Sequence, residues 1–236
     1  MERKIKEKDF WNEKIPFIKK LKDFYSKIYY RGINLWPIMA GECYRYAIPQ
    51  KETWLYRHGM IMKFLLTREN YKPYGKKNKI LVSYFMQRRD HHELLLKAIK
   101  NFPREEVLMM DYYNYKKKNP LLRASFRFPN IIQLFFIWNK FRKAKIKKNL
   151  GKNYFYFIAR TYSRYKEIEQ FYKIIDIYLP RGYISFNSSA FGEETILTLL
   201  CKKRGIPTFT LQHGFLSNYS PQFTSFIIQS ENIVSD

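Results

Sequence analysis

From residue 79 onward, short apolar runs alternate with longer stretches of helical periodicity. Four runs have the length and the β-branched or aromatic content of buried strands: 79–85, 106–112, 182–188 and 208–212. Three stretches between and around them have helical character: 130–150, 161–178 and 191–205. Because strands that alternate with helices form parallel α/β sheets, we expect an α/β fold with a Rossmann-like sheet flanked by helices.

The chain before this alternation has a different pattern. Apolar residues recur at steps of three and four over the first 30 residues, which is typical of an amphipathic helix, and Pro16 is expected to break or restart it. A second helix is expected at 54–67, and the lysine-rich run 75–79 has the composition of a linker. We therefore predict two parts, a basic helical extension over 1–76 and a Rossmann-like domain over 77–236.

The end of the chain bears on domain organisation. The last apolar run, 223–230, is expected to be one more strand, and the sequence stops soon after it without a helix to cover it. Either an edge strand ends the fold or the chain is the first half of a longer protein. We favour the second interpretation, in which a donor-binding domain follows.

The charge balance requires an anionic partner. Lys and Arg number 44 against 20 Asp and Glu, a formal net charge of +24. Nucleic acid, the anionic inner face of a membrane, and a phosphorylated or acidic sugar substrate all satisfy this requirement. Cys43 and Cys201 lie far apart without metal-ligand spacing, which favours a reducing compartment and no metal site. No run reaches the roughly 18 apolar residues of a membrane span, so we expect a cytoplasmic protein.

In a parallel sheet, ligands bind where loops leave the carboxyl ends of the strands. Three loops meet this description, at 86–92, 187–193 and 212–215. In the third, His213 lies between Gln212 and Gly214, and its imidazole suits a general base on an acceptor hydroxyl. The alternative is a buried histidine bonded to a backbone carbonyl. We rank His213 first as a catalytic candidate, with Gln212 and Gly214 as substrate-binding residues.

The other two loops supply further candidates, each with a structural alternative. Asp90 is a second catalytic candidate, although Asp at this place more commonly caps its helix. Arg88 and His91 would bind substrate from the same loop.

In the middle loop, Ser188 and Ser189 would bind an anion or cap the next helix. Glu193 would bind a sugar hydroxyl or interact with the dipole of that helix.

The segment 131–148 is apolar first and cationic afterwards. One interpretation is a helix at a membrane interface, where Trp138 and the lysines would both be accommodated. The other is a core helix with a solvated basic end, to which we give slightly more weight.

Residues 182–231 resemble a known family. A strand that ends in small polar residues, a helix that begins near 192–194, the turn 204–207 and a strand that ends at Gly214 are similar to the end of the N-terminal domain of GT-B-type glycosyltransferases. The resemblance is to bacterial capsule and surface-polysaccharide enzymes, and more distantly to CDP-glycerol glycerophosphotransferases and sugar epimerases. It implies a nucleotide-sugar donor held as a substrate by a second domain, no tightly bound cofactor and no required metal.

We therefore expect an enzyme that transfers a glycosyl or related nucleotide-activated group to a glycan or lipid-linked acceptor, at the inner face of the cell membrane. The chain would supply the acceptor-side domain. One alternative is a non-enzymatic nucleic-acid-binding module, which the charge and the aromatic residues favour. Another is a catalytically silent partner of a separate donor-binding chain.

Overall fold

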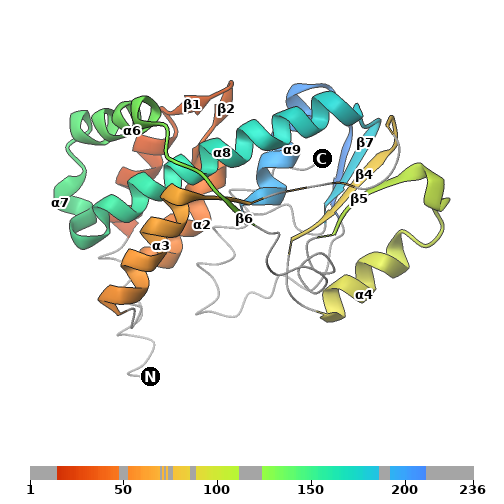
Figure 1. Ribbon diagram of the computed structural model, residues 1–236, viewed down its shortest axis with the longest axis horizontal. Helices are drawn as coiled ribbons and strands as arrows, with labels where there is room; N and C mark the ends of the chain where they lie inside the picture. The colour runs from red at the N-terminus through yellow and green to blue at the C-terminus, as the bar shows by residue number, and fades with distance from the viewer. Residues whose placement is uncertain are drawn as a thin grey trace.

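The computed structural model of the chain describes residues 15–47, 53–69, 71, 73, 77–85, 89–111, 124–185 and 192–210. At its centre lies a four-stranded parallel sheet with the strand order β5-β4-β7-β8 (Figure 1). The strands are β4 (Ile80–Tyr84), β5 (Val107–Asp111), β7 (Gly182–Ser185) and β8 (Thr208–Thr210). Each lies within one of the four predicted runs, so the prediction of a parallel α/β sheet flanked by helices is confirmed.

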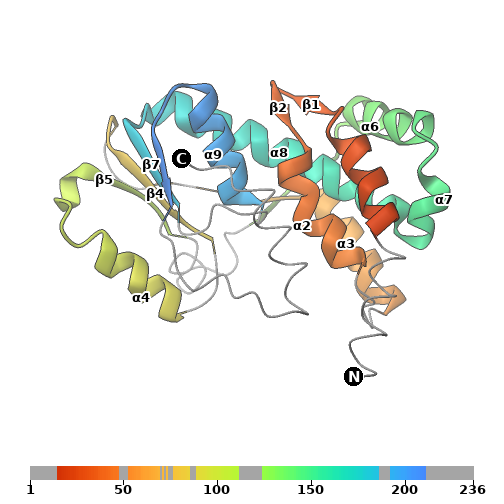
Figure 2. The same ribbon diagram turned by 180° about the vertical axis from the view of Figure 1, so that it is seen from behind.

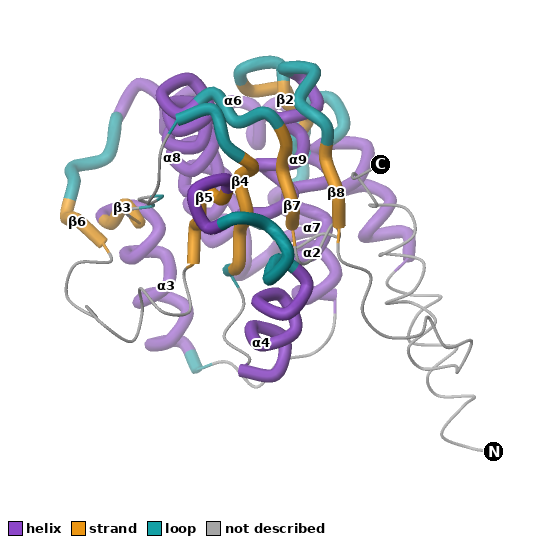
Figure 3. The backbone as a smooth tube through the Cα atoms, turned by 90° about the vertical axis from the view of Figure 1, so that its right-hand side faces the viewer, coloured by secondary structure: helices purple, strands orange, loops and turns teal. Residues whose placement is uncertain are grey.

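Helices cover both faces of this sheet. Helix α4 (Arg89–Ala98) lies on one face, and α8 (Tyr154–Tyr178) and α9 (Glu193–Lys203) lie on the other, as Figure 3 shows. Side chains alternate accordingly along β4: Val82 and Tyr84 pack with Leu95 of α4, whereas Leu81 belongs to the core under α8 and α9. Residues 81–84 are all buried, as expected for a strand enclosed on both faces.

A second group of helices surrounds the other end of α8, away from the sheet (Figures 1 and 2). It consists of a helical segment over residues 15–25 followed by α2 (Trp36–Ala47), α3 (Trp54–Leu66), α6 (Ile131–Lys143) and α7 (Lys147–Leu150). One hydrophobic core runs from these helices to the sheet and includes Leu21, Met39, Phe157 and Leu81. Residues on both sides of position 76 therefore share a core, and a domain boundary at that position stays a prediction.

Several short elements differ from the sequence-based expectation. The first helix ends at residue 25, and β1 (Tyr29–Tyr30) then pairs with β2 (Ile33–Asn34) as an antiparallel hairpin. Arg31 and Gly32 both have positive φ, 54° and 74°, which matches the twist of a tight hairpin. The helix expected as far as about residue 30 was therefore predicted too long, because the hydrophobic spacing continues into the hairpin.

Two further differences concern the middle of the chain. The expected helix over 130–150 is divided into α6 and α7 near Lys145, whose φ is 53°. Strand β3 (Thr67–Glu69) pairs antiparallel with β6 (Ala124–Phe126), and neither strand was predicted, since three residues are too few to show a period. The described part of the chain also contains two short 3₁₀ helices, η1 (Arg104–Glu106) and η3 (Gly151–Asn153).

Of the helices in the described part of the chain, none combines the length and the apolar character that crossing a bilayer requires.

Candidate functional site

The order of the strands defines a topological switch point between β4 and β7. Strand β4 is the first of the four along the chain, β5 pairs on one side of it, and the chain then returns to place β7 on its other side. The connections that leave β4 and β7 thus turn in opposite directions. Ligands of open α/β sheets bind at such a switch point, outside the carboxyl ends of the strands.

A cavity of about 390 Å³ lies at this point. Phe85, which directly follows β4, and Glu193, the first residue of α9 after β7, both line it. The other described residues of the wall lie in α2, α3, β3 and α8, with Tyr71 between β3 and β4. Seven of the lining side chains are charged: Glu42, Lys63, Arg68, Arg160, Lys166, Glu167 and Glu193.

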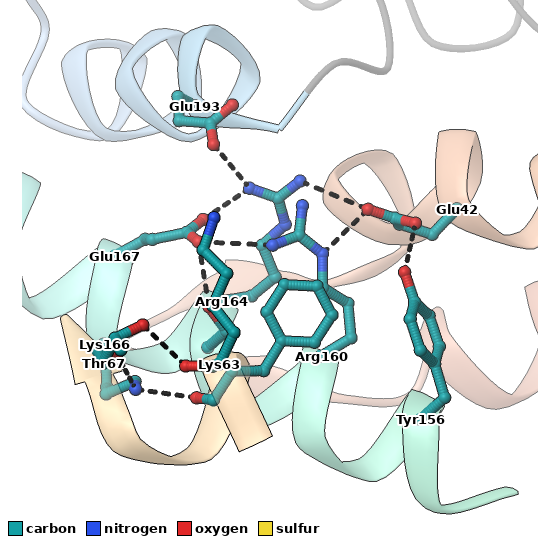
Figure 4. A network of polar contacts seen from close by, with 11 residues as sticks. Glu42, Lys63, Thr67, Tyr156, Arg160, Arg164, Lys166, Glu167 and Glu193 are labelled. Atoms are coloured by element: carbon teal, nitrogen blue, oxygen red, sulfur yellow. Dashed lines mark hydrogen bonds and ion pairs between the residues drawn. The ribbon is translucent and has the colours of Figure 1, made fainter. Parts of the chain in front are cut away.

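Helix α8 contributes the polar stripe at the centre of the site. Tyr156, Arg160, Ser163, Arg164 and Glu167 recur at steps of three and four, which places them on one face of the helix. Helix α8 is nearly enclosed, and most of its residues are buried. The stripe therefore faces α2, α3 and α9 instead of solvent, as Figure 4 shows.

Arg160 joins α8 to α2. Its Nε donates to Oε1 of Glu42 at 2.8 Å, and the hydroxyl of Tyr156 donates to the other oxygen of the same carboxylate at 3.1 Å. The guanidinium lies 4.7 Å from the ring centroid of Phe64 on α3, a cation–π distance. Arg160 on α8 is thus held by groups from two other helices, α2 and α3.

Arg164 lies among three carboxylates. It forms an ion pair with Glu167, and its guanidinium nitrogens lie 3.5 Å from Oε1 of Glu193 and 3.9 Å from Oε1 of Glu42. Its side chain is 4% exposed, and that of Glu167 is 7% exposed. Within the part of the chain that the structure describes, Nε of Arg164 has no hydrogen-bond acceptor.

Burial and ion pairing act in opposite directions on the two arginines. Burial by itself would lower the pKa of Arg160, but Glu42, Glu167 and Glu193 outweigh burial and raise it. The pKa of Arg164 is also raised, because the same three carboxylates outweigh both its burial and the repulsion from Arg160. Both guanidinium groups are therefore fixed positive charges.

Glu193 has a different electrostatic balance. Burial raises its pKa, the ion pair with Arg164 offsets this only in part, and the carboxylate of Glu167 raises it further. Its side chain keeps 27% exposure and lines the cavity. A carboxyl group with a raised pKa that reaches a cavity can exchange a proton with a bound ligand.

Lys166 closes the α3 side of the cavity. Its ammonium group donates to the backbone carbonyls of Phe64 at 2.7 Å and Thr67 at 2.5 Å, at the C-terminal end of α3, where unpaired carbonyls attract a cation. Burial lowers the pKa of Lys166 to about 8, although Glu167 acts in the opposite direction. The lysine is a helix cap, and its contacts position the end of α3 against α8.

A parallel α/β sheet with a polar site at its switch point does not by itself define a family or a function. Comparisons with protein families, with curated proteins and with solved structures find no match to this chain. Any functional assignment therefore rests on the chemistry of the site.

Of the residues selected from the sequence, Glu193 is the one whose side chain the structure describes, and it lies in the cavity. Helix α4 begins at Arg89, so Asp90 and His91 lie in its first turn, and Asp90 is not at the cap. The side chains of these two residues are outside the described part. Six candidates lie wholly outside the described residues: Arg88, Ser188, Ser189, Gln212, His213 and Gly214.

The sequence-based selection missed the polar residues of the helices. Arg160 and Arg164 each pair with both Glu42 and Glu167 in the fold, yet all four residues lie outside the three selected loops. A signal was present in α8, where two arginines and a glutamate recur at helical spacing within an aromatic-rich segment. His92, the neighbour of the candidate His91, is buried and lies 5.1 Å from the ring of Tyr84.

Proposed function

We propose that this chain takes part in glycosyl transfer, or transfer of a related nucleotide-activated group, to a glycan or lipid-linked acceptor in surface polysaccharide synthesis. In this proposal it is the N-terminal half of a GT-B-type enzyme with a basic helical extension, and the cavity at the β4–β7 switch point binds the acceptor. The observation that carries the proposal is the position of Glu193, which joins the cavity to the arginine pair at that switch point. Helix α9 and strand β8 coincide with elements of the family resemblance, which supports it further.

The chemistry of the cavity suits a polyhydroxylated ligand. Its carboxylates accept hydrogen bonds from hydroxyl groups, its guanidinium groups donate them, and Phe64, Tyr71 and Phe85 offer apolar faces. A volume of about 390 Å³ falls within the range of roughly 300–1,000 Å³ found for small-molecule sites. Lys63 and Arg68 would bind a phosphate or carboxylate on the ligand.

Glu193 is the group that we assign to proton transfer on the acceptor. Its carboxylate would accept the proton of the attacking hydroxyl while that oxygen bonds to the anomeric carbon of the donor sugar, and the nucleotide would leave with the electron pair of the broken bond. Arg164 would hold the carboxylate in place. His213 and Asp90 stay the proposed catalytic residues of the loops, and the nucleotide-sugar donor enters as a substrate.

The test is transfer of radiolabelled sugar from a panel of nucleotide sugars to a bacterial lipid extract, measured with the intact enzyme that contains this chain, as wild type and as Glu193→Gln. We expect the substitution to lower the transfer rate by about two to four orders of magnitude, the usual scale for loss of general acid–base catalysis. Because glutamine is nearly isosteric, sugar binding measured by NMR should persist.

Glu105→Gln is the matched control, since Glu105 is exposed on η1 away from the cavity. It should leave transfer unchanged. An unchanged rate in Glu193→Gln would remove Glu193 from the proton-transfer role. Binding of oligonucleotides with no binding of any sugar would replace the proposal with the nucleic-acid alternative.

A further inference from the structure

Helix α6 exposes apolar side chains where a surface helix normally presents polar ones. Asn130 caps the helix by accepting from the backbone N–H of Gln133, and Ile137 and Phe141 are buried against the core. On the outward side, Ile131 is 77% exposed and Phe136 is 61% exposed. Three other large apolar residues of this helix are exposed as well: Ile132, Phe135 and Trp138. The interpretation as a core helix with a solvated basic end is therefore met by Ile137, Phe141 and the exposed lysines, but not by the apolar residues exposed in the first turns.

The exposed face changes from apolar to cationic along the helix. Ile132, Phe136, Lys140 and Lys143 follow one another at steps of four, four and three, so they form a single line on the helix surface. Beside this line, the guanidinium of Arg142 lies 5.3 Å from the ring centroid of Trp138. Apolar and charged groups are thus separated along the helix axis.

The cationic end of this line enters a second pocket. This pocket has a volume of about 600 Å³ and lies between α6 and the helical segment 15–25. Four lysines line it, namely Lys20, Lys27, Lys140 and Lys143, and its apolar surface comes from Phe24, Ile28 and Ile146. Asp23 is the one carboxylate among its described lining residues.

The surrounding sequence reinforces the positive charge. No Asp or Glu occurs between Asp111 and Glu167, whereas α6, α7 and their connection carry six Lys and Arg. The sequence of this segment therefore supplies no carboxylate of its own to offset its lysines. An anionic surface would therefore be attracted to this end of the molecule.

We propose that the exposed face of α6 and the lysine pocket together form a docking surface for an anionic phospholipid bilayer. The first two turns of α6 would enter the interfacial region with Ile132 and Phe136, and the lysines would bind lipid phosphates at the level of the headgroups. This surface is separate from the cavity at the switch point, and the proposal does not depend on catalytic activity.

The arrangement favours a bilayer over nucleic acid. Proteins that bind single strands interleave stacking aromatics with cations along a groove. Here the exposed aliphatic and aromatic residues occupy one end of the helix, and the cations occupy the other. This order matches the change from the acyl region to the headgroup region of a membrane.

The test is sedimentation with vesicles of phosphatidylglycerol and phosphatidylcholine, compared with vesicles of phosphatidylcholine alone. We expect binding to the anionic vesicles that weakens as salt rises. Phe135→Ser with Phe136→Ser should reduce the partition coefficient about tenfold or more, because two large apolar side chains no longer enter the interface. Lys140→Gln with Lys143→Gln should reduce it by roughly tenfold at low salt, and less at high salt.

Matched controls come from α4 and the turn directly after it, at the other end of the molecule (Figure 1). Leu94→Ser with Leu96→Ser removes exposed apolar residues, and Lys97→Gln with Lys100→Gln removes the same charge. Both should leave binding unchanged, and unchanged melting temperatures should show that all variants fold. Equal binding to neutral and anionic vesicles, no binding to either, or equal loss in the α4 variants would overturn the proposal.

Discussion

At the scale of single residues, the best-defined feature is the position of Arg164 among Glu42, Glu167 and Glu193. These three carboxylates come from α2, α8 and α9, so one guanidinium connects three helices that are distant in sequence. A buried ion pair adds little stability compared with apolar packing, but removing one partner leaves the others as uncompensated charge. The cluster therefore makes the fold sensitive to single substitutions.

We predict that Arg164→Met lowers the free energy of unfolding by about 3–5 kcal/mol, because the buried carboxylate of Glu167 loses its closest cation. Urea unfolding monitored by circular dichroism measures the change. Arg204→Met is the control, since Arg204 pairs with Asp176 at the surface and should cost less than about 1 kcal/mol. Similar decreases in the free energy of unfolding of both variants would contradict the prediction that the buried cluster is more sensitive to substitution than a surface ion pair.

The pair Arg31–Glu169 gives a prediction about pH. Partial burial alone would raise the pKa of Glu169, but hydrogen bonds from Arg31 and Tyr30, both 2.7 Å long, lower it below its ordinary value of 4.5. The unfolded chain takes up a proton on this carboxyl near pH 4.5, whereas the folded chain takes it up at a lower pH. The contacts of Glu169 therefore stabilise the fold above about pH 4.5, and this stabilisation is lost as pH falls through the lowered pKa of Glu169.

The free energy of unfolding should therefore be larger for the wild-type chain than for the Glu169→Gln variant at about pH 6. The difference between the two variants should become smaller towards about pH 3. Chemical unfolding at a series of pH values measures it. Glu105→Gln, which replaces an exposed carboxylate, controls for the loss of one negative charge from the chain. A constant difference for Glu169→Gln across the series would rule out the lowered pKa.

At the scale of elements, the start of α9 decides how Glu193 reaches the cavity. Gly192 precedes the helix with φ 61° and ψ −96°, a conformation that L residues with a Cβ rarely adopt. A Cβ at this position would lie 2.3 Å from Nη2 of Arg164. The absence of a side chain thus lets the end of α9 approach the arginine pair.

We predict that Gly192→Ala destabilises the fold by roughly 1–3 kcal/mol, through backbone strain and displacement of Arg164. Gly59→Ala in α3 is the matched control, because a Cβ there meets nothing within 4 Å. It should raise stability by up to about 1 kcal/mol, the difference in helix propensity. Thermal melting of both variants gives the comparison, and the same sign of change in both would exclude the proposed clash.

The elements differ in how well the sequence predicts them. The strands of the sheet are predictable because burial favours short runs of mainly apolar and aromatic residues, as at 81–84, where Ser83 interrupts Leu81, Val82 and Tyr84. The β1–β2 hairpin and the β3–β6 pair are not, since their stability comes from turn geometry and from partners distant in sequence. Helix α8 begins earlier than predicted because its first turns are aromatic on nearly every side, which conceals the helical period.

At the scale of the whole molecule, the candidate site could be predicted in its location but not in its composition. The rule that ligands bind at the carboxyl edge of the sheet selects the connection from β7 to α9, and Glu193, the first residue of α9, lines the cavity there. The partners of Glu193 come from helices that contact it only after the chain has folded. No local pattern in the sequence connects Glu42 with Arg160, so the electrostatics of the cavity required the fold.

The strand order also has a consequence for synthesis of the chain on the ribosome. Strand β4 pairs with β5 soon after both emerge, but its other neighbour, β7, follows about a hundred residues later, as the pairing of Ile80 with Gly182 shows. Translation proceeds at about 5–20 residues per second, so the second edge of β4 stays unpaired for roughly 5–20 s before β7 is made. During that time an apolar strand edge can join edges of other nascent chains. Rapid production of this protein at high temperature should therefore yield aggregates formed before β7 is made, and slower translation or a chaperone that shields strand edges should increase the soluble fraction.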